Sequence, residues 1–167
     1  MKLTTRSVEK PWGRAVLPAP FQAPDAGARI GEIWFVPPPE LPSLLVKYIF
    51  TSEKLSVQVH PSDAQAAAMG ESDGGKEECW LVIDAEPGAT LGVGFRETVD
   101  AETLRAAALD GSIENMLVWH PVQAGDFFYI PAGTVHAIGA GVSLLEIQQN
   151  SDITYRLYEY GRPRELH

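Results

Sequence analysis

Two polar side chains stand close together at the end of an apolar strand pattern in LSVQVHPSD, residues 55–63. Alternate residues of a strand point to the same side, so Gln58 and His60 direct an amide and an imidazole into one small volume. The pattern then stops at Pro61. Side-chain oxygen and imidazole nitrogen are both metal-binding groups. The pair therefore predicts either half of a metal site or a solvated strand face.

A second candidate lies in GDFFYIPAGTVHAIGA, residues 125–140. Its Gly-Asp and Pro-Ala-Gly steps predict turns on either side of the strand FFYI. After the second turn, His136 enters the next strand facing inward. This spacing of Gly, Pro, Gly and His resembles the second motif of the cupins, a jelly-roll superfamily whose barrel often holds a metal.

Four stretches point to one family within this superfamily: LSVQVHP, GKEECW (75–80), NSDITYRLYEYGR (150–162), and KPWGR near the N-terminus. Together with PAGTVHAIGAG they resemble the type I phosphomannose isomerases, particularly the short bacterial forms. The resemblance implies one divalent metal, with Zn²⁺ favoured. It places the ligands on four residues: Gln58, His60, Glu78 and His136.

Two neighbouring acidic residues, Glu77 and Glu78, are candidates for the acidic ligand. The family's Lys-X-Glu pattern reads here as Lys76-Glu77-Glu78. Along a strand Lys76 and Glu78 share a face, while Glu77 points away. Zinc accepts imidazole nitrogen and carboxylate oxygen, and a catalytic zinc keeps one position open. Sites of this kind also admit other divalent ions, so the resemblance predicts the position better than the metal.

The reaction implied by the resemblance interconverts mannose 6-phosphate and fructose 6-phosphate through an enediol. Three residues match active-site positions of the family. We expect Arg156 to bind substrate or enediolate charge, and Lys76 to relay a proton or bind an anion. Asp152 is expected to support them or to act as an acid or base. On one strand, Asp152, Thr154 and Arg156 would all face the cavity.

Other functions fit the same residues. One is a cupin isomerase or epimerase that acts on another sugar. Another is a noncatalytic cupin that binds a metal and a sugar. A cupin dioxygenase is less favoured, because iron sites of that kind use several histidines and only His60 and His136 are placed to bind.

The elements that must position these residues are mostly short strands. Strand patterns cover 29–36, 44–50, 55–60, 76–85, the part of EPGATLGVGF (86–95) after its Pro-Gly turn, and four segments after residue 114, separated by Gly- and Pro-rich turns. Helix patterns cover 61–70 and 99–111, the second with Asp100 as N-cap and Gly111 as stop. The expected fold is all-β, a cupin-type jelly-roll β-barrel with two or so short helices.

The domain prediction is a single cupin-like domain over 1–167, with 1–29 as an irregular N-terminal arm packed on the barrel. Longer members of the resembling family carry further domains, for which 167 residues leave no room. The segment between GEIWFV and LLVKYIF is also shorter than expected. An open cleft would weaken the recognition of phosphate and the exclusion of water.

Composition limits the partners. A net charge of −9 argues against nonspecific binding to nucleic acid, which needs clustered Lys and Arg. No apolar run reaches the length of a membrane span, and the N-terminus does not resemble a signal peptide. A single cysteine, Cys79, suits a reducing compartment. We therefore expect a cytoplasmic protein, monomer or homodimer, whose partner is a small sugar or sugar phosphate.

Overall fold

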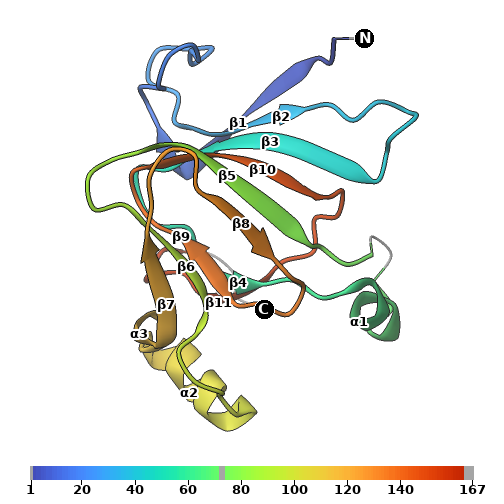
Figure 1. The fold of residues 1–167 in the computed structure, drawn as a ribbon, viewed down its shortest axis with the longest axis vertical. Helices are drawn as coiled ribbons and strands as arrows, with labels where there is room; N and C mark the ends of the chain where they lie inside the picture. The colour runs from blue at the N-terminus through green and yellow to red at the C-terminus, as the bar shows by residue number, and fades with distance from the viewer. Residues whose placement is uncertain (1, 72–73, 164–167) are drawn as a thin grey trace.

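The computed structural model describes residues 2–71 and 74–163. Two antiparallel sheets face each other, and α2 and α3 lie together at one end of the molecule (Figure 1). The first sheet has six strands in the order β1 (Thr5–Arg14), β2 (Ile30–Phe35), β3 (Leu44–Phe50), β10 (Val142–Gln149), β5 (Glu78–Ala85) and β8 (Phe127–Ile130).

The second sheet has five strands in the order β11 (Tyr155–Tyr158), β4 (Val57–Val59), β9 (His136–Ile138), β6 (Thr90–Phe95) and β7 (Leu117–Pro121). The helices of the described residues are α1 (Asp63–Ala68), α2 (Ala101–Asp110) and α3 (Ile113–Met116). This mainly β architecture confirms the predicted fold class.

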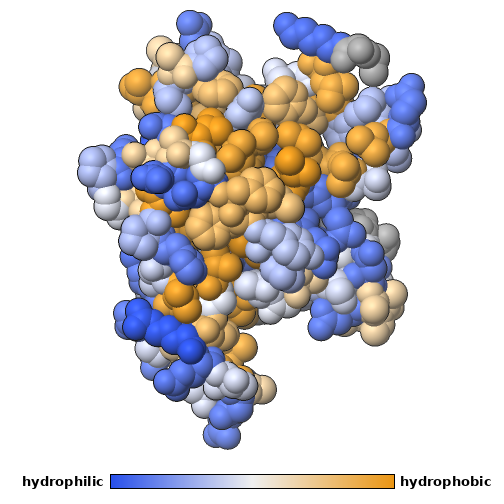
Figure 2. Space-filling model, viewed as in Figure 1, coloured by the Kyte–Doolittle hydropathy of each residue, from blue (hydrophilic) through white to orange (hydrophobic). Residues whose placement is uncertain are grey.

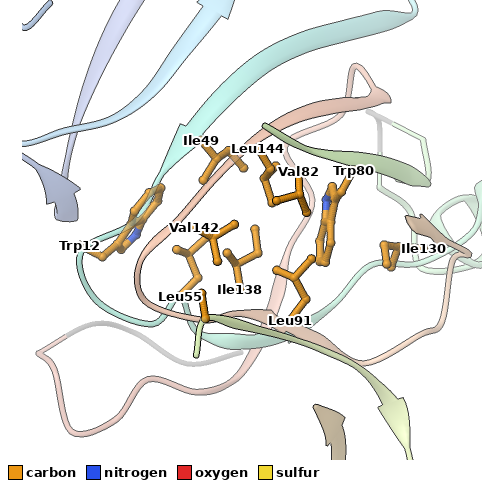
Figure 3. Packing of buried hydrophobic residues seen from close by; sticks show 11 residues of the cluster. Trp12, Ile49, Leu55, Trp80, Val82, Leu91, Ile130, Ile138, Val142 and Leu144 are labelled. Carbon is orange, nitrogen blue, oxygen red and sulfur yellow. The ribbon is translucent and has the colours of Figure 1, made fainter. Parts of the chain in front are cut away.

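The core lies between the two sheets and explains their alternating patterns. Along β5 the buried residues Glu78, Trp80 and Val82 alternate with partly exposed ones. Figure 3 shows Trp12 and Trp80 on opposite sides of a cluster of aliphatic side chains contributed by both sheets. Burial of this apolar surface is the main force that holds the sheets together.

Both predicted helices form, each shorter than its pattern by one or two residues at either end. The Asp100 carboxylate accepts a hydrogen bond from the Thr103 backbone N–H at 2.8 Å, and Gly111 ends α2 in the left-handed region with φ 84°. In α1, Ser62 and Gln65 form a reciprocal capping box. The short helix α3 was not predicted, because IENM carries too few residues for a periodic signal.

The N-terminal arm differs from the prediction. Residues 1–29 were expected to be irregular, yet Thr5–Arg14 forms β1 and pairs with β2 at the edge of the sheet. The charged residues and the Pro-Trp-Gly step do not resemble a typical strand pattern, so the sequence did not predict β1. An edge strand nevertheless tolerates Pro and Lys. The following residues do pack on the barrel, where the Phe21 ring lies 4.6 Å from that of Tyr48.

The outer side of the six-stranded sheet carries an apolar surface. Cross-strand pairs place Leu81 beside Phe127, Cys79 beside Tyr129, and Ile147 beside Cys79. Phe127 is 60% exposed and Tyr129 55% exposed. We call Leu81, Phe127, Tyr129 and Ile147 the outer apolar face. Hydrophobic residues gather over the middle of the view in Figure 2, where these strands run in Figure 1.

Candidate metal centre and cavity

The candidate ligands come from both sheets. In the five-stranded sheet, Gln58 of β4 lies between His136 of β9 and Arg156 of β11 in register. The strand predicted over LSVQVH is only Val57–Val59, so His60 follows its end instead of lying within it. Glu78 begins β5 in the opposite sheet and points inward. The site therefore depends on the two sheets packing face to face.

Three of the predicted ligands converge. One ligand atom each from His60, Glu78 and His136 lies within 4.8 Å of the others, and all three residues are buried. The Nε2 atom of His60 is 3.2 Å from Glu78 Oε1, and that of His136 is 3.7 Å from Glu78 Oε2. This is a compact cluster of imidazole nitrogen and carboxylate oxygen.

Backbone carbonyls fix the orientation of both imidazoles. The Nδ1–H of His60 donates to the Ile153 carbonyl at 2.8 Å, and that of His136 donates to the Thr134 carbonyl at 2.9 Å. A proton held on Nδ1 leaves Nε2 unprotonated, as a metal ligand must be, and both Nε2 atoms lie near Glu78. Such a hydrogen bond behind a histidine is the usual support of a metal ligand.

The amide of Gln58 has the reverse orientation to that of a ligand. Its Nε2 lies 3.3 Å from His136 Nε2, while its Oε1 accepts a hydrogen bond from the Ser56 hydroxyl at 3.1 Å. Carboxamides bind metals through oxygen, so Gln58 joins the donor set only when its amide turns over. Gln58 lies beside His136, and rotation of its terminal amide by half a turn would exchange the positions of Nε2 and Oε1.

The charges in the cluster suit a cation. Burial opposes ionisation of Glu78, but Lys76 at 3.0 Å and the two histidines hold its pKa well below the ordinary value. Burial lowers the pKa of His136 to about 4, although Glu78 partly opposes this. At neutral pH the cluster is thus an ionised carboxylate with a neutral imidazole, the states that bind metal.

The hydrogen bonding of the buried polar atoms in the cluster indicates whether a metal would fit there. Among the described residues, His60 Nε2 and both carboxylate oxygens of Glu78 make no well-aligned hydrogen bond. Glu78 Oε1 has Lys76 Nζ at 3.0 Å as an ion-pair partner, and the convergence of the three atoms on one point leaves a place for a cation. Imidazole and carboxylate donors suit a divalent metal.

A cavity opens beside this cluster, and all three predicted catalytic residues line it. Lys76 is buried, Arg156 is partly exposed and Asp152 is exposed at the rim. The prediction that Asp152, Thr154 and Arg156 share one strand is wrong in detail, because β11 begins at Tyr155. Asp152, Thr154 and Arg156 nevertheless border the same cavity.

Three buried charged residues of the cavity wall were missed, and Glu32 of β2 is one of them. Glu146 of β10 and Lys47 of β3 are 3% and 7% exposed, and Lys47 Nζ lies 2.9 Å from Glu146 Oε1. Burial, together with the charge of Glu78, raises the pKa of Glu146. The available signal was a single charged residue within each of the apolar runs LLVKYIF and SLLEIQQ.

The chain is similar to curated proteins and solved structures of one kind. No family model matches the chain. It is 47% identical over 130 residues to a mannose-6-phosphate isomerase of Streptococcus mutans, covering 74% of this chain and 40% of that protein. It is 45% identical over 130 residues to mannose-6-phosphate isomerase ManA of Bacillus subtilis, covering 74% of this chain and 41% of that protein. The chain is a homologue of the mannose-6-phosphate isomerases.

Solved structures extend the homology to nearly the whole chain. The crystal structure of mannose 6-phosphate isomerase from Bacillus subtilis superposes with a TM-score of 0.86 at 32% identity, over 99% of this homologue and 65% of that chain. A phosphomannose isomerase of Salmonella typhimurium, at 15% identity and a TM-score of 0.69, shares the fold. These matches confirm the predicted resemblance and the cupin-type fold.

The homology covers part of the relatives. This homologue spans about two fifths of the length of the curated relatives it matches. Within the part of the chain that the structure describes, no helix combines the length and apolar character needed to cross a membrane.

Proposed function

We propose that the chain forms a zinc-dependent active site that interconverts mannose 6-phosphate and fructose 6-phosphate. One observation carries the proposal: two histidines with fixed Nδ1–H groups and an ionised glutamate converge beside a cavity lined by Lys76 and Arg156. The similarity to two mannose-6-phosphate isomerases supports the same reaction.

The ligand set we propose is Gln58, His60, Glu78 and His136. Two nitrogens and two oxygens around one ion are typical of zinc sites that leave a position open. When bound, zinc would supply positive charge that stabilises the oxygens of the sugar as the proton moves. Lys76 holds the Glu78 carboxylate through its ion pair at 3.0 Å, which fixes one ligand and leaves N–H groups for an anion.

The isomerisation moves two protons. One leaves C2 and returns at C1, and another leaves O2 while one is gained at O1, so the enediol forms and decays without net change in atoms. A group that accepts a carbon-bound proton must be shielded from water and fixed in place. Glu146, 3% exposed at the cavity wall, meets both conditions, and we assign it this proton transfer.

The remaining charged residues face the substrate from the cavity mouth. We assign Arg156 to the phosphate or to the developing enediolate charge, because a guanidinium is always ionised and presents several donors. Asp152, exposed at the rim, is assigned to the sugar hydroxyls and their proton exchange. A cytoplasmic location stays a prediction from the sequence.

The test is turnover that depends on the metal. Purified protein loaded with zinc is expected to convert mannose 6-phosphate to fructose 6-phosphate in a coupled assay, and His136→Ala is expected to lose both bound zinc and turnover. His120→Ala is the matched control, since that imidazole packs against Phe128 at 5.7 Å and should be dispensable. Stoichiometric zinc with no turnover of wild-type protein contradicts the isomerase.

A further inference from the structure

One level of the six-stranded sheet carries an unbroken row of cross-strand neighbours. Register pairs join them in sequence across all six strands. We call this the cross-strand row: Arg6, Trp34, Lys47, Glu146, Trp80 and Phe128. Trp34, Lys47 and Glu146 of the row line the cavity, while Arg6 at the open end is exposed and stacks 4.5 Å above the Trp34 ring.

The carboxylate of Glu146 is held at both oxygens. Trp80 Nε1–H donates to Oε2 at 2.8 Å, and Lys47 Nζ lies 2.9 Å from Oε1. Trp80 is fully buried, so its ring cannot move without disturbing the core. Lys47 is therefore the adjustable half of this pair of contacts and the only cation that touches Glu146 among the ion pairs of the described residues.

Lys47 is itself anchored by a second carboxylate. Glu32 Oε1 lies 3.9 Å from Lys47 Nζ, and Glu32 Oε2 accepts a hydrogen bond from Trp34 Nε1 at 2.7 Å. Lys10 approaches Glu32 from the outer side at 3.8 Å. Burial opposes a charged lysine here, but Glu146 and Glu32 outweigh it and raise the pKa of Lys47. The ammonium thus stays charged between two carboxylates.

We infer that Lys47 is a positioning residue for the reaction, with Glu32 as its anchor. It holds the Glu146 carboxylate in one orientation at the cavity wall, and its positive charge favours the ionised form that accepts the carbon-bound proton. This inference rests on the proposed isomerase function. The ion pairs that join Glu32, Lys47 and Glu146 would then serve turnover as well as folding.

The alternative is that the network only stabilises the fold. Buried ion pairs are weak evidence for stability, since apolar replacements of similar size are often tolerated. A structural role would lower stability and leave the pH dependence of turnover unchanged. A positioning role lowers kcat with little change in KM, and it moves the pH profile, because an ammonium beside a carboxylate lowers the carboxylate's pKa.

The decisive variant is Lys47→Met, which keeps the length of the side chain and removes the charge. We expect kcat to fall about 100-fold or more, the loss typical of a displaced acid–base group. The acid limb of kcat is expected to move to higher pH by about 1 pH unit or more. Zinc content should stay stoichiometric, because the ion-pair partners of Lys47 among the described residues are Glu32 and Glu146, neither of which is a proposed ligand.

Three matched variants complete the test. Lys47→Arg keeps the charge and should recover most of kcat and the wild-type acid limb. Glu32→Gln keeps an acceptor for Trp34 and should cause a smaller fall than Lys47→Met. Arg6→Met changes the exposed end of the same row and should retain wild-type turnover. Equal losses in the Met and Arg variants, with an unshifted pH profile, overturn the inference.

A readout without turnover separates this inference from the proposed function. In protein carrying ¹³C-labelled glutamate carboxyls, the Glu146 resonance is assigned by its loss in Glu146→Gln. Its titration should move to higher pH in Lys47→Met and stay in place in Arg6→Met. If wild-type protein shows no isomerase activity, the proposed function fails. An unchanged Glu146 titration in Lys47→Met overturns the role of Lys47 whether or not the protein turns over.

Discussion

At the scale of single residues, the cluster around Glu78 depends on the protonation of its neighbours. His136 is fully buried, and its pKa is lowered from 6.5 to about 4, chiefly by burial. At a pH between these two pKa values, this histidine is protonated in the unfolded chain and neutral in the folded protein. Stability of the metal-free protein therefore falls as the pH drops through this window.

We expect the free energy of unfolding of the metal-free protein to decrease by about 3 kcal/mol between pH 7 and pH 4 from His136 alone. Glu78 adds to the loss below its ordinary value of 4.5, because its carboxylate is stabilised in the folded state. Urea unfolding in EDTA at several pH values measures this. In His136→Gln the free energy of unfolding should depend less steeply on pH between pH 6.5 and 4.5. Equal slopes in the wild-type protein and the variant would contradict the role of His136.

How far the sequence predicts the site depends on the signal around each residue. Gln58, His60, Glu78 and His136 each lie in a local pattern that marks them, and three of them converge as predicted. Glu146 and Lys47 were missed because neither lies in such a pattern. Their role follows from strand register, which joins β3 to β10 across about a hundred residues of chain.

At the scale of elements, the loop before β5 joins the metal cluster to α1. Gly75 N–H donates to Asp63 Oδ1 at 2.8 Å, and Lys76 N–H donates to the Pro61 carbonyl at 2.9 Å. A Cβ atom on Gly75 would overlap the backbone of Ser62 and Asp63. The close approach of these two segments therefore requires glycine.

Gly75→Ala is expected to weaken zinc binding about tenfold or more, because Lys76 and Glu78 must shift away from His60. The matched control is Gly88→Ala in the turn after β5, where φ is 83° and the added Cβ meets open space. That change should cost about 1 kcal/mol of stability and leave the zinc affinity unchanged. Competition with a chromophoric chelator measures both affinities, and equal affinities in the two variants would refute the coupling.

At the scale of the whole molecule, the outer apolar face exposes large apolar side chains next to one another. Phe127 and Tyr129 are each more than half exposed. Contiguous exposed apolar patches of this kind bind hydrophobic dyes and promote association. The alternating pattern of DFFYIPA predicts a strand but does not say which side lies outside.

We expect wild-type protein to enhance ANS fluorescence, and Phe127→Lys to reduce that enhancement clearly. Because the residue is exposed, the free energy of unfolding should change by no more than about 0.5 kcal/mol. Val16→Lys is the control, since Val16 is 83% exposed and lies outside the face. ANS titration with urea unfolding checks both parts. Equal fluorescence in the two variants would show that the face is not the binding surface.

The cross-strand row also restricts how such a chain can change over evolutionary time. Each of its six residues comes from a different strand and meets its neighbours only in one register. Inserting or deleting a single residue inside β3 or β10 would send Lys47 or Glu146 to the outer surface. Length variation should therefore accumulate in the turns between strands, while the strands themselves admit substitutions but not changes in length.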